Sequence, residues 1–280
     1  MAFESIDDLI AGMASNGYTA SINRSSLSGA VAGLEMSLWR GSGFPAQGSI
    51  PATATICNAA TLGAYPLAPR TGGQQRIISG ISGQMATAGH TLIIEDRLGH
   101  QGGLSGIVTT AQTVNLDVYT NLGTNNLVER IGAADYSQIE WYLDWYSATG
   151  ATVSTPIAQV TYHDGTTGNV NIWGAAGSGA LPASVAANRR YKLVPTIGKF
   201  IRSVQTVTLS ASTGTAGNFG VTAVKRLCFH ECTSALALQV RDWSILTAPK
   251  VADNSCVTFG QMCITTTTGA TFARISQAVA

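Results

Sequence analysis

Charged residues are scarce in this sequence. They make up 11% of its 280 residues, and the net charge is +1, whereas an average soluble protein has roughly 25% charged residues. Without a basic surplus the chain cannot displace counterions from phosphates, so free nucleic-acid binding is not expected. A soluble monomer usually keeps more charge on its surface, so we expect much of this surface to lie against other subunits.

Lysine is the rarer of the two cationic residues. Twelve of the sixteen basic residues are arginine and four are lysine. The planar, weakly hydrated guanidinium suits buried polar contacts and interfaces, whereas lysine is typical of open solvent. The bias agrees with a chain that assembles with partners, although codon usage in a GC-rich genome would produce it too.

A targeting signal and a membrane-spanning segment are both missing. The chain opens with MAFE, and acidic Asp7 and Asp8 follow, which is unlike the basic start of a signal peptide. No apolar run approaches the roughly 20 residues that cross a bilayer as a helix. We therefore expect a protein that is made in a cytoplasm, stays soluble and has no membrane partner.

The cysteines do not form a recognisable metal site. Cys228, His230 and Cys232 would share one face of a strand, and together with Cys256 and Cys263 they could surround a metal. Their spacings are C-x₃-C and C-x₆-C, however, and not the paired C-x₂-C of structural zinc sites. Buried thiols in a reducing compartment are the favoured interpretation. We expect no metal, no cofactor and no small-molecule substrate.

What the chain does contain is β sequence. It has 31 glycines, 32 threonines and 24 serines, and 45% of its residues are hydrophobic, which is typical of a folded chain. In residues 136–147 Trp141 and Trp145 share one parity with Ile139 and Leu143, as in a half-buried antiparallel strand. Further strands are expected at 34–39, 53–57, 91–96, 112–119, 200–211, 219–229, 236–246 and 256–268, and as a hairpin over 160–172.

The N-terminal quarter differs from the rest. Residues 3–14 have helical apolar spacing, with Ser5 as a possible cap. Residues 15–75 are broken by glycine and proline and are expected to form an extended arm or a large loop with short strands. Because loops this long are uncommon inside compact domains, the segment is expected to lie along a neighbour. We therefore divide the chain into a helix-and-arm region, 1–75, and an antiparallel β-sandwich of jelly-roll type, 76–280.

A faint internal repeat suggests two related β units. Thr87-Ala88-Gly89, a strand and Arg97-Leu98 resemble Thr215-Ala216-Gly217, a strand and Arg226-Leu227. If the match is a duplication, the related units lie near 76–125 and 200–250.

Candidate catalytic groups are few. His163-Asp164 lies in a glycine-containing turn, where Asp bonds its local backbone. Glu95-Asp96-Arg97 is interpreted as an ion pair at a strand end, on the surface or at a contact. Neither a G-x-S-x-G elbow nor a phosphate loop is present. We expect no enzyme.

The expected binding surfaces are apolar and aromatic. Trp141 and Trp145 with Tyr142 and Tyr146 could form a sugar-binding platform, but a core on one side and a packed interface on the other is favoured. The apolar groups of the N-terminal region are expected to lie partly against a neighbouring subunit. The candidate interface residues are Phe3, Ile6, Leu9, Ile10, Trp39, Phe44, Tyr142 and Tyr146.

One block of the chain resembles a known group of proteins. Residues 191–222, which begin with YKL and end with GKFIRSVQTVTLSASTGTAGNFGVT, are similar to uncharacterised virion structural proteins of tailed bacteriophages. So are the short helix followed by Asn16-Gly17, the loop WRGSGFP at 39–45 and the hairpin region at 136–170. The resemblance is strongest at 190–227, and it implies a location in the virion head and not a catalytic role.

The resemblance and the composition together predict a structural protein of the phage head. Its partners would be copies of itself and other capsid proteins. Because shell proteins of tailed phages carry a long spine helix and no pattern here exceeds about twelve helical residues, a decoration or cement protein is favoured over the major capsid shell protein. A tail or receptor-binding adhesin is the other alternative.

Overall fold

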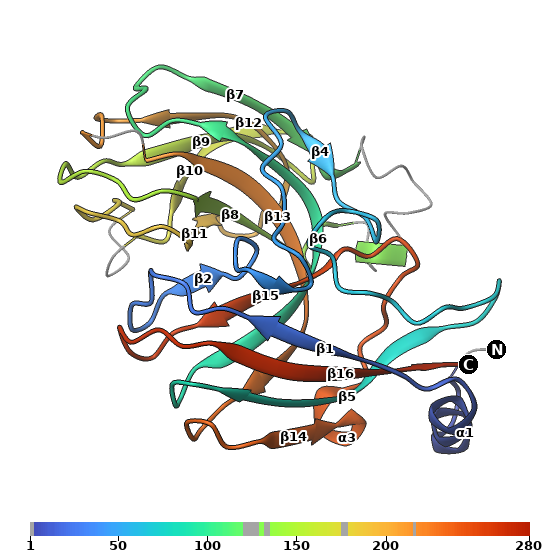
Figure 1. The fold of residues 1–280 in the computed structure, drawn as a ribbon. Helices are drawn as coiled ribbons and strands as arrows, with labels where there is room; N and C mark the ends of the chain where they lie inside the picture. Colours follow the sequence, from blue (N-terminus) through green and yellow to red (C-terminus); the bar gives the residue numbers. More distant parts are fainter. Residues whose placement is uncertain (1–2, 120–128, 132–134, 175–178, 215–216) are drawn as a thin grey trace.

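The computed structural model describes residues 3–119, 129–131, 135–174, 179–214 and 217–280, and nearly all regular structure within them is β (Figure 1). The labelled helices are α1 (Ile6–Asn16) and α3 (Trp243–Leu246). The strands are β1 (Tyr18–Arg24), β2 (Glu35–Ser37), β3 (Gly43–Phe44), β4 (Thr55–Ile56), β5 (Arg76–Met85), β6 (Thr91–Leu104), β7 (Gln112–Asp117), β8 (Ile139–Trp145), β9 (Pro156–Tyr162), β10 (Thr167–Ile172), β11 (Arg189–Val194), β12 (Ile201–Leu209), β13 (Phe219–Glu231), β14 (Gln239–Asp242), β15 (Val257–Met262) and β16 (Thr271–Val279). The prediction of a mainly β fold with a short N-terminal helix is confirmed.

Two sheets hold the described strands. A five-stranded sheet has the order β14-β5-β16-β1-β3, and an eleven-stranded sheet follows β2-β15-β6-β13-β8-β11-β10-β9-β12-β7, with β4 attached to β6. β2 pairs with β11 as well as with β15. The first six strands of the larger sheet therefore close into a ring.

Two apolar cores lie on either side of this ring. The lower core in Figure 1 packs the five-stranded sheet against β2, β15, β6 and β13, with Ile81 and Phe259 among its members. The upper core lies inside the curved sheet that runs from β6 through β13 and β8 to β7, and it contains Trp141 and Trp145. The long strands β6 and β13 serve both cores, since Ile94 of β6 belongs to the lower one and Leu98 to the upper one.

The pattern of strand pairs is nearly symmetric. If each strand of the N-terminal part is swapped with a corresponding strand of the C-terminal part, most strand pairs are again pairs that occur in the structure. The exchange maps β1, β2, β5, β6, β7, β8 and β9 onto β10, β11, β12, β13, β14, β15 and β16 in turn. Under it, β5–β14 becomes β12–β7, β1–β16 becomes β10–β9, and β6–β13 maps onto itself. Among the described strands the pairs β10–β11, β1–β3 and β4–β6 lack a counterpart. A duplicated unit would produce this pattern, and the duplication itself remains a prediction; Thr215 and Ala216 of the sequence repeat lie outside the described residues.

The segment predicted to extend as an arm, residues 15–75, lies within the fold instead. β1 sits between β16 and β3, and β2 belongs to the ring. Buried Arg24 at the end of β1 donates to the carbonyl oxygens of Gly41 and Ala46, at 2.7 and 3.2 Å, and so holds the following loop against the sheet. The sequence conceals this role because the partner strand β16 is at the other end of the chain.

Several strand predictions are confirmed with small shifts in their bounds. The alternating segment forms β8, and the hairpin forms β9 and β10. The stretch expected as one strand at 236–246 is instead β14 followed by α3, because Asp242 accepts a hydrogen bond from the Ser244 backbone N–H, at 3.1 Å, and starts a helix. β16 was not among the predicted strands. Its buried residues include the polar Thr271 and Gln277, so the alternation of apolar and polar residues that marks a strand is weak there.

The upper core gives a direct test of the fold. Trp141 is 1% exposed and its indole N–H donates to the Ile201 carbonyl at 2.9 Å. We expect Trp141→Ala to lower the free energy of unfolding by about 3–5 kcal/mol, measured by chemical denaturation. The matched control is Trp173→Ala, because that indole is 60% exposed and its removal should leave the unfolding midpoint near that of the wild type. Equal midpoints for Trp141→Ala and the wild type would contradict this core.

Candidate functional site

The inside of the ring is lined with charged side chains. Successive residues of a strand point to opposite faces, so Trp141 and Leu143 of β8 face the upper core while Tyr142 and Asp144 face into the ring. Ion pairs connect the charged groups that meet there. They are Glu35, Glu95, Arg97, Glu140, Asp144, Arg190, Lys192 and Arg226.

Arg190 of β11 is the centre of this network. Its Nη1 lies 2.8 Å from Oε1 of Glu95 on β6, and its Nη2 lies 2.9 Å from Oε2 of Glu35 on β2. The guanidinium carbon stands 4.4 Å from the centre of the Tyr142 ring. Burial acts to lower the pKa of Arg190, but the two carboxylates hold it well above its ordinary value. The side chain is therefore a permanent cation that ties three ring strands together.

A second cluster occupies the ring beside the first. Arg97 lies 3.1 Å from Oδ2 of Asp144, which also accepts the Thr222 hydroxyl at 2.7 Å. The Arg97 guanidinium stacks 4.5 Å from the ring centre of Trp39. Burial and the adjacent Arg97 keep the pKa of His100 well below its ordinary value, so this imidazole is neutral.

These contacts correct the interpretation of Glu95-Asp96-Arg97 as a cluster at an exposed strand end. All three residues are buried within the long strand β6. Asp96 points away from the ring to an ion pair with Arg130, and it accepts the Cys256 backbone N–H at 2.9 Å. Their partners come from strands remote in sequence, so local spacing gives no signal of burial.

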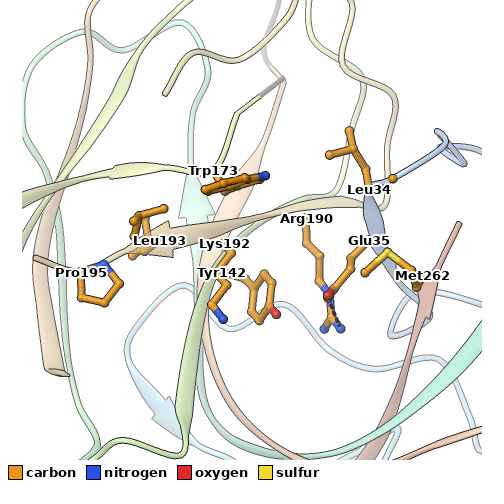
Figure 2. A pocket seen from close by; sticks show the side chains of 11 residues that line it. Leu34, Glu35, Tyr142, Trp173, Arg190, Lys192, Leu193, Pro195 and Met262 are labelled. Carbon is orange, nitrogen blue, oxygen red and sulfur yellow. Dashed lines mark hydrogen bonds and ion pairs between the residues drawn. The ribbon is translucent and has the colours of Figure 1, made fainter. Parts of the chain in front are cut away.

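A pocket of about 550 Å³ opens at the mouth of the ring between β2 and β11 (Figure 2). Tyr142, Arg190 and Glu35 line it together with Lys192, and the exposed indole of Trp173 stands at its edge. Apolar side chains complete the wall. They are Leu34, Leu193, Val194, Pro195 and Met262.

The ion pairs of Glu140, beside this pocket, determine its protonation. Lys192 Nζ lies 2.6 Å from Oε1 of Glu140, and the Tyr142 hydroxyl donates to Oε2 at 2.7 Å. Burial acts to raise the pKa of Glu140, but Arg226, Lys192 and Tyr142 lower it to about 2. A carboxylate with this pKa is a weak base at neutral pH. Glu140 itself is therefore poorly suited to accept a proton.

The structure separates the eight candidate interface residues into two groups. Leu9, Trp39 and Tyr142 are buried in their own chain, so they cannot contact a neighbour, and their assignment to an interface is corrected. Tyr146 is turned inward as well, with its hydroxyl 2.9 Å from Nε2 of His100. The residues that retain accessible surface are Phe3, Ile6, Ile10, Phe44 and, in part, Tyr146.

The sugar platform of four aromatic residues does not form. Trp141 and Trp145 face the upper core, and Tyr142 is covered by the ring network. Trp173 is an exposed aromatic residue near the charged ring. The sequence indicates this orientation. Val170 and Ile172 face the core, and successive side chains of a strand alternate between its two faces, so Trp173 must point outward.

The cysteine and histidine candidates are dispersed. Cys228, Cys232 and Cys263 belong to the lower core, whereas Cys256 packs beside Cys57 and Trp39. No group of three or more His, Cys, Asp or Glu residues that could hold a metal ion occurs in the described part of the chain.

The turn interpretation of His163-Asp164 is confirmed. Asp164 Oδ1 accepts the Thr166 backbone N–H at 3.0 Å, and this bond closes the loop between β9 and β10. The adjacent imidazole is also used structurally, since His163 Nδ1 accepts the Phe200 backbone N–H at 3.2 Å.

Comparisons with known proteins identify no relative of this chain. No family model, no curated protein and no solved structure matches the chain. Within the described ranges, every helix is too short or too polar to cross a membrane. Function must therefore be inferred from the chain's own residues.

The Arg190 network can be tested through the glycine that makes room for it. Gly260 of β15 faces the guanidinium, and a Cβ at this position would overlap Nη2 of Arg190. We expect Gly260→Ala to destabilise the fold by about 1–3 kcal/mol, as overpacking does, in chemical denaturation. Gly80→Ala on β5 is the control, since a Cβ there would be 3.5 Å from its nearest neighbour, the Arg241 carbonyl oxygen. Equal losses in both variants would contradict a specific role for the network.

The depressed pKa of Glu140 predicts a pH dependence. Its pKa is about 2 in the folded state against an ordinary 4.5, so the ionised form stabilises the fold above pH 4.5. This contribution is lost as the pH falls from about 4.5 to 2. The stability difference between the wild type and Glu140→Gln should therefore be largest near neutral pH and vanish near pH 2. A difference that stays constant across this range in denaturation profiles would rule out the coupling.

Proposed function

We propose that the chain is a structural protein of a tailed-phage virion that decorates or cements the head through contacts between subunits. The observation that carries the proposal is the distribution of charge. The chain has 31 charged residues, and eight of them lie buried within the described fold, all but Arg24 in ion pairs. Those that are buried are Arg24, Arg76, Glu95, Asp96, Arg97, Arg130, Asp144 and Arg190.

The outward faces of both sheets are consequently poor in charge. On the five-stranded sheet the pairing registers place Phe44, Asn23, Phe272 and Gln84 in one row across the strands, and Leu238, just before β14, lines a pocket with Gln84 and Phe272. The next row holds Ser21, Arg274, Ser82 and Val240. We call these two rows the outer sheet face.

The other end of the molecule has a similar surface. There Gln159 of β9 is flanked by Asn169 and Thr206, and Thr206 by Thr113. Surfaces that remain in water normally carry interspersed Lys, Arg, Asp and Glu. Leu238 and Val240 are 67% and 66% exposed on the outer sheet face. An apolar and amide-rich face of this kind fits burial against another subunit.

The strand order supports a virion role as well. We infer that each half is a jelly roll, with β1-β16-β5-β14 facing β2-β15-β6-β13 and β10-β9-β12-β7 facing β11-β8-β13-β6. Jelly rolls have eight strands in two sheets, and they occur in capsid proteins, lectins and cupins. The longest labelled helix, α1, has eleven residues, so the described residues give no support to a shell protein with a spine helix.

Charge insertion on the outer sheet face tests this function. We expect Val240→Glu to weaken association of the purified chain with itself and with isolated phage heads by about tenfold or more, because it buries an unpaired carboxylate. Sedimentation and head co-pelleting would measure the loss. Ile197→Glu is the control, since this side chain is fully exposed on a turn remote from that face. Association that is unchanged in Val240→Glu would exclude this face as the contact.

A further inference from the structure

Trp173 occupies an unusual position for a large apolar residue. It follows the last residue of β10, and its backbone N–H donates to the Lys192 carbonyl at 2.6 Å. Ile172 faces the upper core, so the indole lies on the opposite side with Lys192, which pairs in turn with Tyr142. The three side chains form a row across β10, β11 and β8. Trp173 remains 60% exposed, whereas Trp141 and Trp145 are buried in the upper core.

The charges around this row cancel. Arg190, Lys192 and Arg226 contribute three positive charges, and Glu35, Glu95 and Glu140 contribute three negative charges. Each cation has a carboxylate within ion-pair distance. An anion or a cation entering the pocket would therefore meet no net charge of opposite sign. The polar groups are nevertheless held in place, because their ion pairs fix their orientation.

We propose that this pocket binds a neutral saccharide. A sugar ring has an apolar face, formed by its C–H groups, that can lie on the indole of Trp173, and hydroxyls at its edge that can bond to fixed charged groups. The wall offers both: the indole of Trp173 and, across the pocket beside Glu35, Met262 are apolar, and Lys192 and Glu35 are polar (Figure 2). The volume of about 550 Å³ lies within the roughly 300–1,000 Å³ of small-molecule sites.

Other ligand classes fit this wall less well. A phosphate or a uronic acid needs a cation that is not already neutralised, and here Arg190 and Lys192 are each paired with a carboxylate. A purely apolar ligand would strip water from Glu35 and Lys192 without replacing their hydrogen bonds, which is costly. A polyhydroxylated neutral ring satisfies the polar and the apolar part of the pocket together.

Saturation-transfer NMR on the full chain would test the proposal. The probes are neutral oligosaccharides of glucose, galactose, mannose, rhamnose and N-acetylglucosamine, beside oligosaccharides of uronic acids at equal concentration. We expect at least one neutral probe to bind, and Trp173→Ala to weaken that binding about tenfold or more, as the loss of an aromatic anchor does. Ile197→Ala, on an exposed turn outside the pocket, should bind as the wild type does.

Three results would overturn the proposal: binding of no neutral probe, preference for the uronic acids, or binding that survives in Trp173→Ala. The stability measured for Trp173→Ala separates a lost contact from a lost fold. Saccharide binding is independent of the head-association assay, because the pocket residues and the outer sheet face share no side chain. Failure of one proposal therefore leaves the other standing.

Discussion

The buried ion pairs inside the ring hold the two halves of the molecule in one arrangement. Arg190 reaches Glu95 and Glu35, and Arg97 reaches Asp144, so a layer of paired charges separates the two apolar cores. A buried ion pair seldom adds much net stability over apolar packing, but removing one partner leaves a charge without compensation and costs about 3–5 kcal/mol. We infer that the network mainly determines which strands pair to close the ring. If one strand lacked its charged side chain, the partner charge would be buried without an ion pair.

The same network explains the surface of the molecule. In a chain with so few charged residues, each one that lies inside is missing from the outside. The outer sheet face carries Arg274 as its one charged side chain among Asn, Gln, Ser and apolar groups such as Leu238 and Phe272. We propose that this surface contacts another subunit, which would link the interior of the fold to the proposed role in a particle. The composition alone indicated such contacts, but not where they lie.

Patterns local to one strand predicted the structure well, and patterns that need a distant partner did not. The alternation around Trp141 and Trp145 identified β8 and its buried face, because period-two burial is a property of a single strand. Glu95-Asp96-Arg97 was placed at a surface, since its partner Arg190 is 95 residues away from Glu95 and carries no sequence mark. Residues 15–75 suggested an arm for the same reason: β1 becomes a central strand only beside β16. Tyr142 was assigned to an interface because the ring that covers it is not visible in the sequence.

The central claim is that this charge-poor chain is a structural component of a phage head. Quantitative mass spectrometry of purified particles, with labelled reference peptides, would count its copies per virion against a protein of known copy number. A decoration or cement protein repeats with the symmetry of the shell, so the account predicts copies in the hundreds. A handful of copies per particle, or recovery of the chain with isolated tails, would contradict it.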